Sequence, residues 1–277
     1  MSSLESAVSI LKCFSPDLSE LAVTEVASRL AMPKSTASRL LQTMAELGLV
    51  EQDAATRRYR VGLLPFRLGQ LYYAHVRVVD LVEAEVEALV DETGFTGYIG
   101  VLNGSDIVIL RKQLGRYPVQ MVLDAGTRLD AANTAFGKAL LARSGDDELR
   151  VLLSATPVGR NAGGRAAGGR SAAAGLLTEL EQVRRQRWAF GDSVYPGMCA
   201  IGAAVGSCDD QQAVGFSLSF PGAAVDQAAR RAIALRVVEA ARKVAAATAD
   251  PLWAGARASP TELVSKTAAR RARTARA

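Results

Sequence analysis

The sequence predicts a two-domain α+β protein, in which a small helical domain with a β-hairpin precedes a larger domain built on an antiparallel sheet. The chain has 277 residues, more than one typical compact domain needs. Apolar residues repeat at helical spacing through the first fifty positions, and strand-like segments occur early and late in the remainder with helical segments between them. A composition of 49% hydrophobic and 22% charged residues favours a soluble, globular chain.

The first domain is predicted from three helical patterns and a hairpin. The helices are expected over 3–14, over 24–30 with Thr24 as N-cap, and from Pro33 to a stop at Gly48. Strand-like segments at 49–52 and 58–61 flank a polar turn. Three helices and a hairpin in about sixty residues outline a winged helix-turn-helix, with any small helical domain carrying a hairpin as the alternative.

The second domain follows a connecting helix, expected over 63–79. Further helices are expected at 79–93, 134–143, 146–153, 176–188 and 225–248, and strands at 95–102, 107–112, 119–123, 199–205 and 213–220. Residues 159–175, rich in Gly, Ala and Arg, are expected to form a mobile loop. The predicted divisions are a first domain over 1–62, a linker helix over 63–80, a second domain over 81–250 and a basic tail over 251–277.

The net charge of +5 comes from the tail. Residues 251–277 contain six basic residues and one acidic residue, so their surplus equals that of the whole chain. Residues 29–67 are locally basic, with seven Lys or Arg against three Asp or Glu. A nucleic-acid interaction must therefore be argued from local arrangement. We expect the tail to be disordered, because it has nothing to bury.

Several classes of protein are disfavoured. The longest charge-poor apolar run, 193–208, is interrupted by Pro196 and three glycines, and the N-terminus lacks a signal-peptide pattern, so we expect a cytoplasmic protein. Three widely spaced cysteines form neither a disulfide framework nor a zinc-binding spacing. No dinucleotide or Walker motif is present, and His75 is the single histidine. We therefore expect no enzyme activity, no metal and no cofactor.

The third helix and the hairpin carry the side chains of a nucleic-acid interface. The start of this helix concentrates short hydroxyls and cations, and its free N–H groups suit phosphate oxygens, while long polar side chains reach base edges in a major groove. Arginines on the hairpin suit the backbone or the minor groove. A solvated polar helix face is the alternative. The residues predicted to contact DNA are Lys34, Ser35, Thr36, Ser38, Arg39, Arg57, Arg58 and Arg60.

A second candidate site lies on the later strands. Pro196 and Gly197 place a turn and the Cys199 thiol at the start of an apolar strand, and Ser217 and Ser219 lie on one face of another strand because side chains repeat every two residues. These donors in an apolar sheet suit a pocket for a small organic acid held by hydrogen bonds. The alternative is that small residues merely allow the sheet to pack against helices.

The chain resembles the isocitrate-lyase-regulator (IclR) family of bacterial transcriptional regulators. The resemblance covers roughly residues 3–248, in the order and close to the spacing of the family. It is carried by Ser3–Ala7, Pro33–Leu41, Arg58–Gly62, Ala135–Ala142 and Pro196–Cys199.

The resemblance implies a winged helix-turn-helix joined by a linker helix to a GAF-like effector domain. It further implies a homodimer or homotetramer that binds near-palindromic, double-stranded promoter DNA and a small carboxylate or aromatic acid. The implied effector-binding residues are Met121, Leu129, Phe136, Asp192, Cys199, Ser217 and Ser219. Phe136 is bulkier than the residues usual at its position.

Two further hypotheses compete with an effector-controlled transcription regulator. One is a GAF-type thiol redox enzyme or sensor that uses Cys199, because backbone N–H groups in a glycine-flanked turn lower a thiol pKa. The other is a DNA-binding protein without an effector. Replacing Cys199 with Ser would abolish activity in the first, and ligand-induced stabilisation would be absent in the second.

Overall fold

The computed structural model describes residues 2–15, 18–75, 77–117, 123–155, 169–192, 196–208 and 212–254. The chain divides into two compact units, Met1–Val76 and Arg77–Ala277. Within the described ranges no helix is both long enough and apolar enough to cross a membrane.

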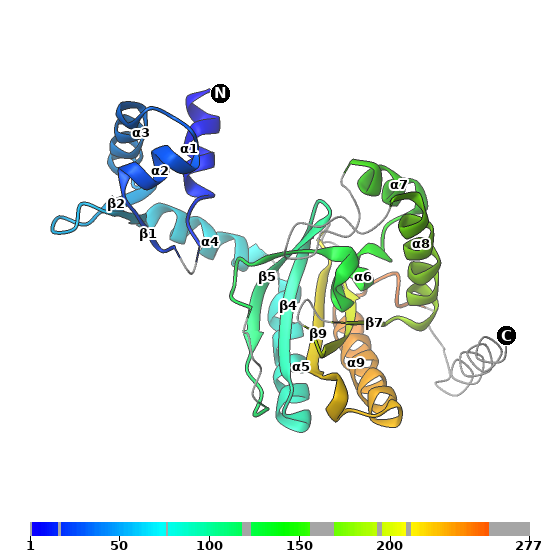
Figure 1. Ribbon diagram of the computed structural model, residues 1–277. Coiled ribbons are helices and arrows are strands. Elements are labelled where there is room, and N and C mark those ends of the chain that lie inside the picture. Colours follow the sequence, from blue (N-terminus) through cyan, green and yellow to red (C-terminus); the bar gives the residue numbers. More distant parts are fainter. Residues whose placement is uncertain are drawn as a thin grey trace. The chain divides into compact units, whose positions relative to one another are not determined.

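The first unit is a helical domain with a small antiparallel sheet of strand order β1-β3-β2 (Figure 1). Its core is a cluster of buried side chains from α1, α2, α3 and the sheet, including Ile10, Leu21, Leu41 and Tyr59. This is the predicted winged helix-turn-helix arrangement. Its elements are α1 (Ser3–Leu11), β1 (Glu20–Leu21), α2 (Val23–Arg29), α3 (Lys34–Glu46), β2 (Val50–Gln52), β3 (Tyr59–Val61) and α4 (Leu63–His75).

Three local details of this unit differ from the expectation. Helix α2 begins before Thr24, with Ala22 at the N-cap position, and the Glu25 carboxylate accepts the Ala22 N–H at 2.7 Å. Pro33 is the N-cap of α3 rather than its first residue. Strand β1 was not predicted, because two residues carry no periodicity and are defined only by pairing with β3.

The second unit is built on a six-stranded antiparallel sheet of order β6-β5-β4-β9-β8-β7. The strands are β4 (Thr96–Asn103), β5 (Asp106–Gln113), β6 (Arg128–Asp130), β7 (Ala189–Asp192), β8 (Met198–Val205) and β9 (Val214–Pro221). The helical elements are α5 (Arg77–Thr93), η1 (Ala131–Asn133), α6 (Ala135–Leu141), α7 (Asp146–Ala155), α8 (Gly169–Gln186), η2 (Gly222–Ala224) and α9 (Gln227–Ala247).

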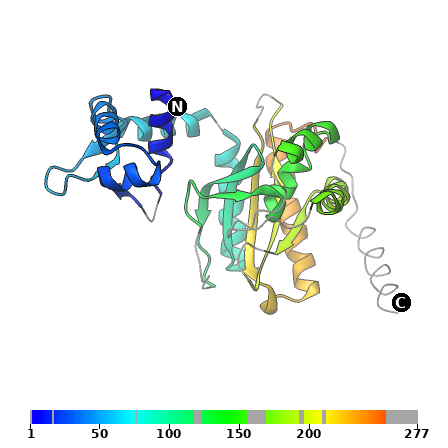
Figure 2. The ribbon, with the colours of Figure 1, turned by 45° about the horizontal axis from the view of Figure 1, so that its top comes forward.

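Helices cover both faces of this sheet (Figures 1 and 2). Helices α5 and α9 lie on one face, where a Cβ on Gly97 would come within 2.4 Å of Val86 in α5. Helix α6 lies on the other face, where a Cβ on Gly202 would come within 2.7 Å of the Phe136 amide nitrogen. We call these the α5/α9 face and the α6 face. Glycine on the strands therefore allows close approach of helices on both sides.

The second unit corrects several predicted boundaries. Helix α8 begins at Gly169, inside the segment 159–175 that was expected to be a loop, while 159–168 lie outside the described residues. The expected strand over 119–123 lies almost entirely outside the described residues as well. The short strands β6 and β7 were not predicted. Both are edge strands that are defined by one partner, β5 and β8 respectively.

The expected disorder of the tail is wrong for its first four residues. Trp253 is 9% exposed, and its indole N–H donates to the Ala204 carbonyl of β8 at 3.1 Å. The Asp250 carboxylate just before it accepts hydrogen bonds from Arg143 and from the Gly206 N–H. The chain therefore remains part of the second unit through residue 254, and residues 255–277 lie outside the described part.

Candidate functional site

Helix α3 presents a polar surface opposite a buried one. Ala37, Leu41 and Met44 are buried in the first unit, whereas Lys34 and Arg39 are exposed. Ser35 and Gln42 are exposed on the same helix, and Thr36 and Ser38 are half-buried. The five predicted contacts on α3 thus lie on its accessible side or at its edge.

The start of α3 suits an anion. Unlike α1 and α2, which have Glu5 and Glu25 in their first turns, α3 has no acidic residue there. Its N-cap is Pro33, which makes no side-chain hydrogen bond, so the first amide donors of the helix are not capped by a side chain. Free amides, the helix dipole and the Lys34 cation favour phosphate at this end.

The turn of the hairpin between β2 and β3, which we call the wing, is held by hydrogen bonds to Asp53. Asp53 accepts hydrogen bonds from the amides of Ala55 and Thr56, at 2.9 and 2.7 Å, and from the Thr56 hydroxyl. Two bonds from Thr56 and one from Ala55 hold the pKa of Asp53 below its usual range. Arg57 follows with a positive φ of 58°, a left-handed backbone that is uncommon for a residue other than glycine. Its side chain is exposed.

The other two wing arginines are engaged within the first unit. Arg58 donates to the Glu20 carbonyl and to the Glu25 carboxylate, at 3.1 and 2.7 Å. Arg60 pairs with Glu51, its direct neighbour across the hairpin, at 3.2 Å. The three arginines that the sequence grouped together therefore have different environments.

Ser217 and Ser219 do lie together on the α6 face of the second unit. Ser217 is paired in register with Tyr98 and Gly202, and Ser219 with Thr96 and Ala200, and directly paired residues share a face. The two serines are 3% and 8% exposed. Neither side chain has a hydrogen bond to another described residue, which leaves two donors available on a largely buried surface.

Phe136 fills the neighbouring part of that face. A Cβ on Gly100 would lie 3.0 Å from its ring, and a Cβ on Gly215 would lie 2.6 Å from it. The ring is 3% exposed and belongs to the same cluster of apolar side chains as Leu129, which is partly buried on β6. Phe136 and Leu129 therefore lie on the α6 face with the two serines.

The structure does not bring Cys199 to the same place. Cys199 is paired with Phe220, while its neighbour Ala200 is paired with Ser219, so the Cys199 side chain lies on the α5/α9 face. A Cβ on Gly222 would lie 2.8 Å from its sulfur. The backbone of Asp192 is paired with Cys199 at the end of β7. Met121 lies outside the described residues.

Sequence reasoning missed two polar residues beside the serines. Thr96 and Tyr98 are 1% and 5% exposed and share the α6 face through pairing with Ser219 and Ser217. Tyr98 accepts the Leu123 N–H through its phenol oxygen at 3.4 Å, and Thr96 accepts the Gly115 N–H. The two-residue spacing of Thr96 and Tyr98 on a predicted strand was the available signal.

Two lysines on this side of the sheet are paired with acids. Lys138 of α6, whose side chain is 13% exposed, bonds Glu179 of α8 at 2.6 Å. Lys112, which is paired in register with Tyr98, forms an ion pair with Asp124. Among the described residues we find no group of His, Cys, Asp and Glu that could hold a metal ion.

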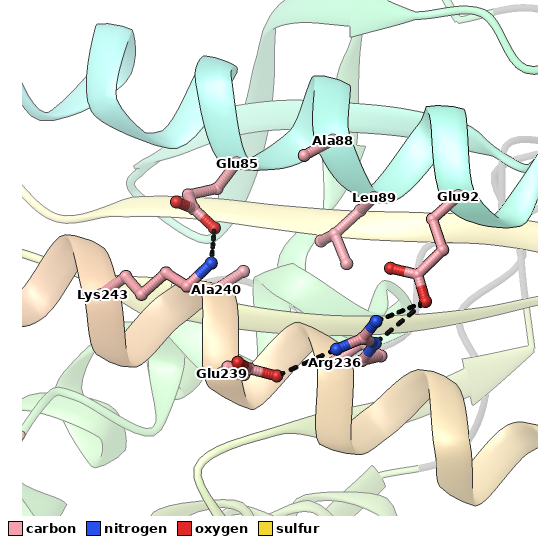
Figure 3. A pocket seen from close by; sticks show the side chains of 8 residues that line it. All are labelled: Glu85, Ala88, Leu89, Glu92, Arg236, Glu239, Ala240 and Lys243. Carbon is pink, nitrogen blue, oxygen red and sulfur yellow. Dashed lines mark hydrogen bonds and ion pairs between the residues drawn. The ribbon is translucent and has the colours of Figure 1, made fainter.

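The opposite side of the second unit carries a groove between α5 and α9 (Figure 3). Arg236 donates to Glu92 at 2.7 and 2.9 Å and to Glu239 at 3.3 Å, and Lys243 reaches Glu85 at 3.3 Å. The Arg236–Glu92 and Lys243–Glu85 pairs join α9 to α5, whereas the Arg236–Glu239 pair lies within α9. The groove is therefore accounted for by the packing of two helices of opposite charge.

Comparison with known proteins agrees with both units. The model of the IclR helix-turn-helix domain matches residues 3–54, and that of the bacterial transcriptional regulator IclR C-terminal domain matches residues 70–246. The HTH-type transcriptional regulator BhcR of Paracoccus denitrificans is 30% identical over 241 residues, covering 87% of this chain and 85% of that protein. The regulator KdgR of Escherichia coli is 29% identical over 248 residues, covering 87% and 93%.

Solved structures show the same fold. An IclR transcriptional regulator from a Silicibacter species gives a TM-score of 0.74 at 21% identity, covering 90% of this chain and 97% of that one. An IclR homologue from Microbacterium hydrocarbonoxydans, complexed with 4-hydroxybenzoate, gives a TM-score of 0.70 at 20% identity, covering 88% of this chain and 97% of that one. Both family models and the full-length relatives agree, so the chain belongs to the IclR family of bacterial transcriptional regulators and is a DNA-binding regulator, not an enzyme.

Proposed function

We propose that this regulator reads promoter DNA with the exposed side of α3 and with its wing. The observation that carries the proposal is the uncapped, acid-free start of α3, with Lys34 as its first residue and the exposed Arg39 five residues further along the helix. The contacts proposed for the major groove are Lys34, Ser35, Thr36, Ser38 and Arg39. The wing arginines Arg57, Arg58 and Arg60 serve the backbone or the minor groove, either directly or through the position of the wing.

Replacing Arg39 tests the major-groove part. If Arg39 contacts a base, Arg39→Ala lowers affinity by about 1–3 kcal/mol and relaxes the preference at one base pair. Lys12→Ala, which removes an exposed cation at the end of α1, is the matched control and changes affinity without changing the base preference. Equal base preferences in wild-type protein and Arg39→Ala, measured by competition with single-substitution duplexes, would rule out base reading by Arg39.

The effector is proposed to bind on the α6 face. Ser217 and Ser219 offer hydroxyls to a ligand, and Phe136 and Leu129 form an apolar wall. The cations Lys112 and Lys138 are already paired, which favours recognition by hydrogen bonds rather than by a new ion pair. A small organic acid with an apolar body fits this chemistry, and the IclR homologue complexed with 4-hydroxybenzoate shows the fold with such a molecule.

We propose that the protein acts in the cytoplasm as a homodimer or a pair of homodimers. Helices α1 and α4 expose apolar side chains, and helix-turn-helix dimers read two half-sites with two recognition helices. Burial of these side chains between two copies would remove them from water. The exposed residues are Leu4, Val8, Leu63, Phe66, Leu68 and Leu71, of which Leu4 is 75% exposed and Phe66 60%.

A further inference from the structure

Arg58 links the wing to α2 through hydrogen bonds to Glu20 and Glu25, and we call this set of contacts the bracket. Its Nη2 donates to the Glu20 carbonyl of β1 at 3.1 Å and to Oε2 of Glu25 at 2.7 Å. The same Glu25 oxygen accepts the Ala22 N–H at 2.7 Å. Arg58 directly precedes β3, whose Tyr59 is paired with Leu21 of β1. One side chain therefore joins the base of the wing, the edge strand and the start of α2.

The charges in this bracket favour the paired state. The Ala22 amide, and then the Arg58 guanidinium, hold the pKa of Glu25 below its usual value, so Glu25 is ionised at neutral pH. The side chains of Arg58 and Glu25 are 35% and 43% exposed. A phosphate that recruited Arg58 would have to displace this carboxylate and would leave an anion beside the DNA.

Arg57 has the opposite character, although it is the adjacent residue. Its backbone is fixed: its N–H donates to the Asp53 carbonyl at 3.0 Å, and its own carbonyl accepts the Gln52 side-chain amide at 3.1 Å. Its side chain is exposed and forms no ion pair with any described residue. A free cation on an ordered turn loses little backbone entropy when it binds an anion.

Building on the proposed function, we infer that Arg57 is the wing's contact to the DNA, and that Arg58 and Glu25 are positioning residues that hold the wing against α2. The bracket fixes where the wing lies relative to the helix-turn-helix within the first unit. Arg57 is thereby already positioned to contact the DNA before binding.

The two roles predict opposite effects of removing the Glu25 charge. If Arg58 contacts phosphate, Glu25 competes with the DNA, and Glu25→Gln raises affinity. If the bracket positions the wing, Glu25→Gln weakens binding even though an anion has been removed. Glu51→Gln is the matched control, because Glu51 pairs with Arg60 on the same hairpin and the net charge changes equally. We expect Glu51→Gln to bind as well as wild type or more tightly.

The test uses the full-length protein and fluorescence anisotropy with the duplex upstream of its own gene, against a scrambled duplex, over a salt series. We expect Glu25→Gln and Arg58→Ala to lose about three- to tenfold in affinity with an unchanged salt slope. We expect Arg57→Ala to lose affinity and to reduce the slope by about one unit. Arg58→Lys, which keeps a cationic donor, should recover most of the loss and guards against a variant that fails to fold.

Two results overturn the inference alone: tighter or unchanged binding by Glu25→Gln, or a reduced salt slope in Arg58→Ala together with a wild-type slope in Arg57→Ala. Failure of Arg58→Lys to recover affinity, when its melting temperature equals that of wild type, also contradicts it. A wild-type protein that binds both duplexes equally overturns the proposed function itself, and the inference with it.

Discussion

Asp250 fixes the end of the second unit, and replacing it should destabilise that unit strongly. Its side chain is fully buried. Arg143 donates to its two oxygens at 2.8 and 3.1 Å, and the Gly206 and Leu252 amides donate at 2.7 and 3.0 Å. Burial alone would raise the pKa of Asp250, but the hydrogen bonds from Arg143 and Gly206 outweigh it and lower the pKa.

The substitution Asp250→Asn keeps the shape and reverses one set of bonds. The remaining carbonyl oxygen still accepts hydrogen bonds, but the new NH₂ group is a donor and faces other N–H donors where the second oxygen stood. Arg143, whose side chain is only 18% exposed, also loses the negative charge that it was paired with. Breaking a buried pair in this way costs about 3–5 kcal/mol. At about 2–4 °C per kcal/mol for a domain of this size, the melting temperature should fall by about 10 °C.

Thermal unfolding followed by circular dichroism measures this effect. The control is Asp226→Asn at the exposed N-cap of α9, which removes the charge but keeps a side-chain oxygen that accepts the Ala229 N–H, and it should cost at most about 1 kcal/mol. Because the folded pKa of Asp250 is depressed, its contribution to the free energy of unfolding is complete above the ordinary carboxyl pKa of ~3.9 and is lost as pH falls through the lower folded value. The difference in melting temperature between wild type and Asp250→Asn should therefore become smaller only in strong acid. Equal stabilities of Asp250→Asn and Asp226→Asn at neutral pH would refute the reasoning.

Three further outcomes are expected. Truncation after Ala254 should leave the melting temperature unchanged. Truncation before Asp250 should lower it, because the buried Trp253 and the Arg143–Asp250 ion pair are then lost. Equal melting temperatures of the two truncated proteins would contradict this expectation. The ligand for the next test is the small carboxylic acid that raises the melting temperature most. Ser219→Ala should weaken its binding, measured by calorimetry, by about 0.5–1.5 kcal/mol, and Cys199→Ser on the opposite face should leave its binding unchanged. Weaker binding by Cys199→Ser and unchanged binding by Ser219→Ala would place the ligand on the α5/α9 face. Phe66→Asp should shift the protein toward monomers in light scattering, and an unchanged molar mass would exclude α4 from the contact between copies.

Periodicity alone predicted the elements with strong local signals. Helix α3 was predicted because its apolar residues repeat at helical spacing between Pro33 and Gly48, and Gly48 has the positive φ of 72° that such a stop requires. Strands β8 and β9 were predicted within a residue at each end because both are charge-free runs in which apolar residues predominate. Strands β1, β6 and β7 were not, because they are short and exist through their partners.

The candidate sites depended on facts that the sequence does not contain. That Ser217 and Ser219 share a face follows from their spacing, but the face of Cys199 depends on the register between β8 and β9. Arg57, Arg58 and Arg60 are chemically alike in the sequence, and only the folded chain shows which of them already has a partner. Burial of the residues after α9 depends on Arg143, more than a hundred positions earlier.

Binding of the full-length protein to the DNA upstream of its own gene tests the central claim most directly. Anisotropy should be measured for this duplex and for a scrambled duplex of equal length, across a salt series, with a protein truncated after Ala254 in parallel to remove the basic tail. The account predicts a sequence preference that survives at physiological salt and is kept by the truncated protein. Equal, steeply salt-dependent binding of both duplexes by both proteins would contradict it.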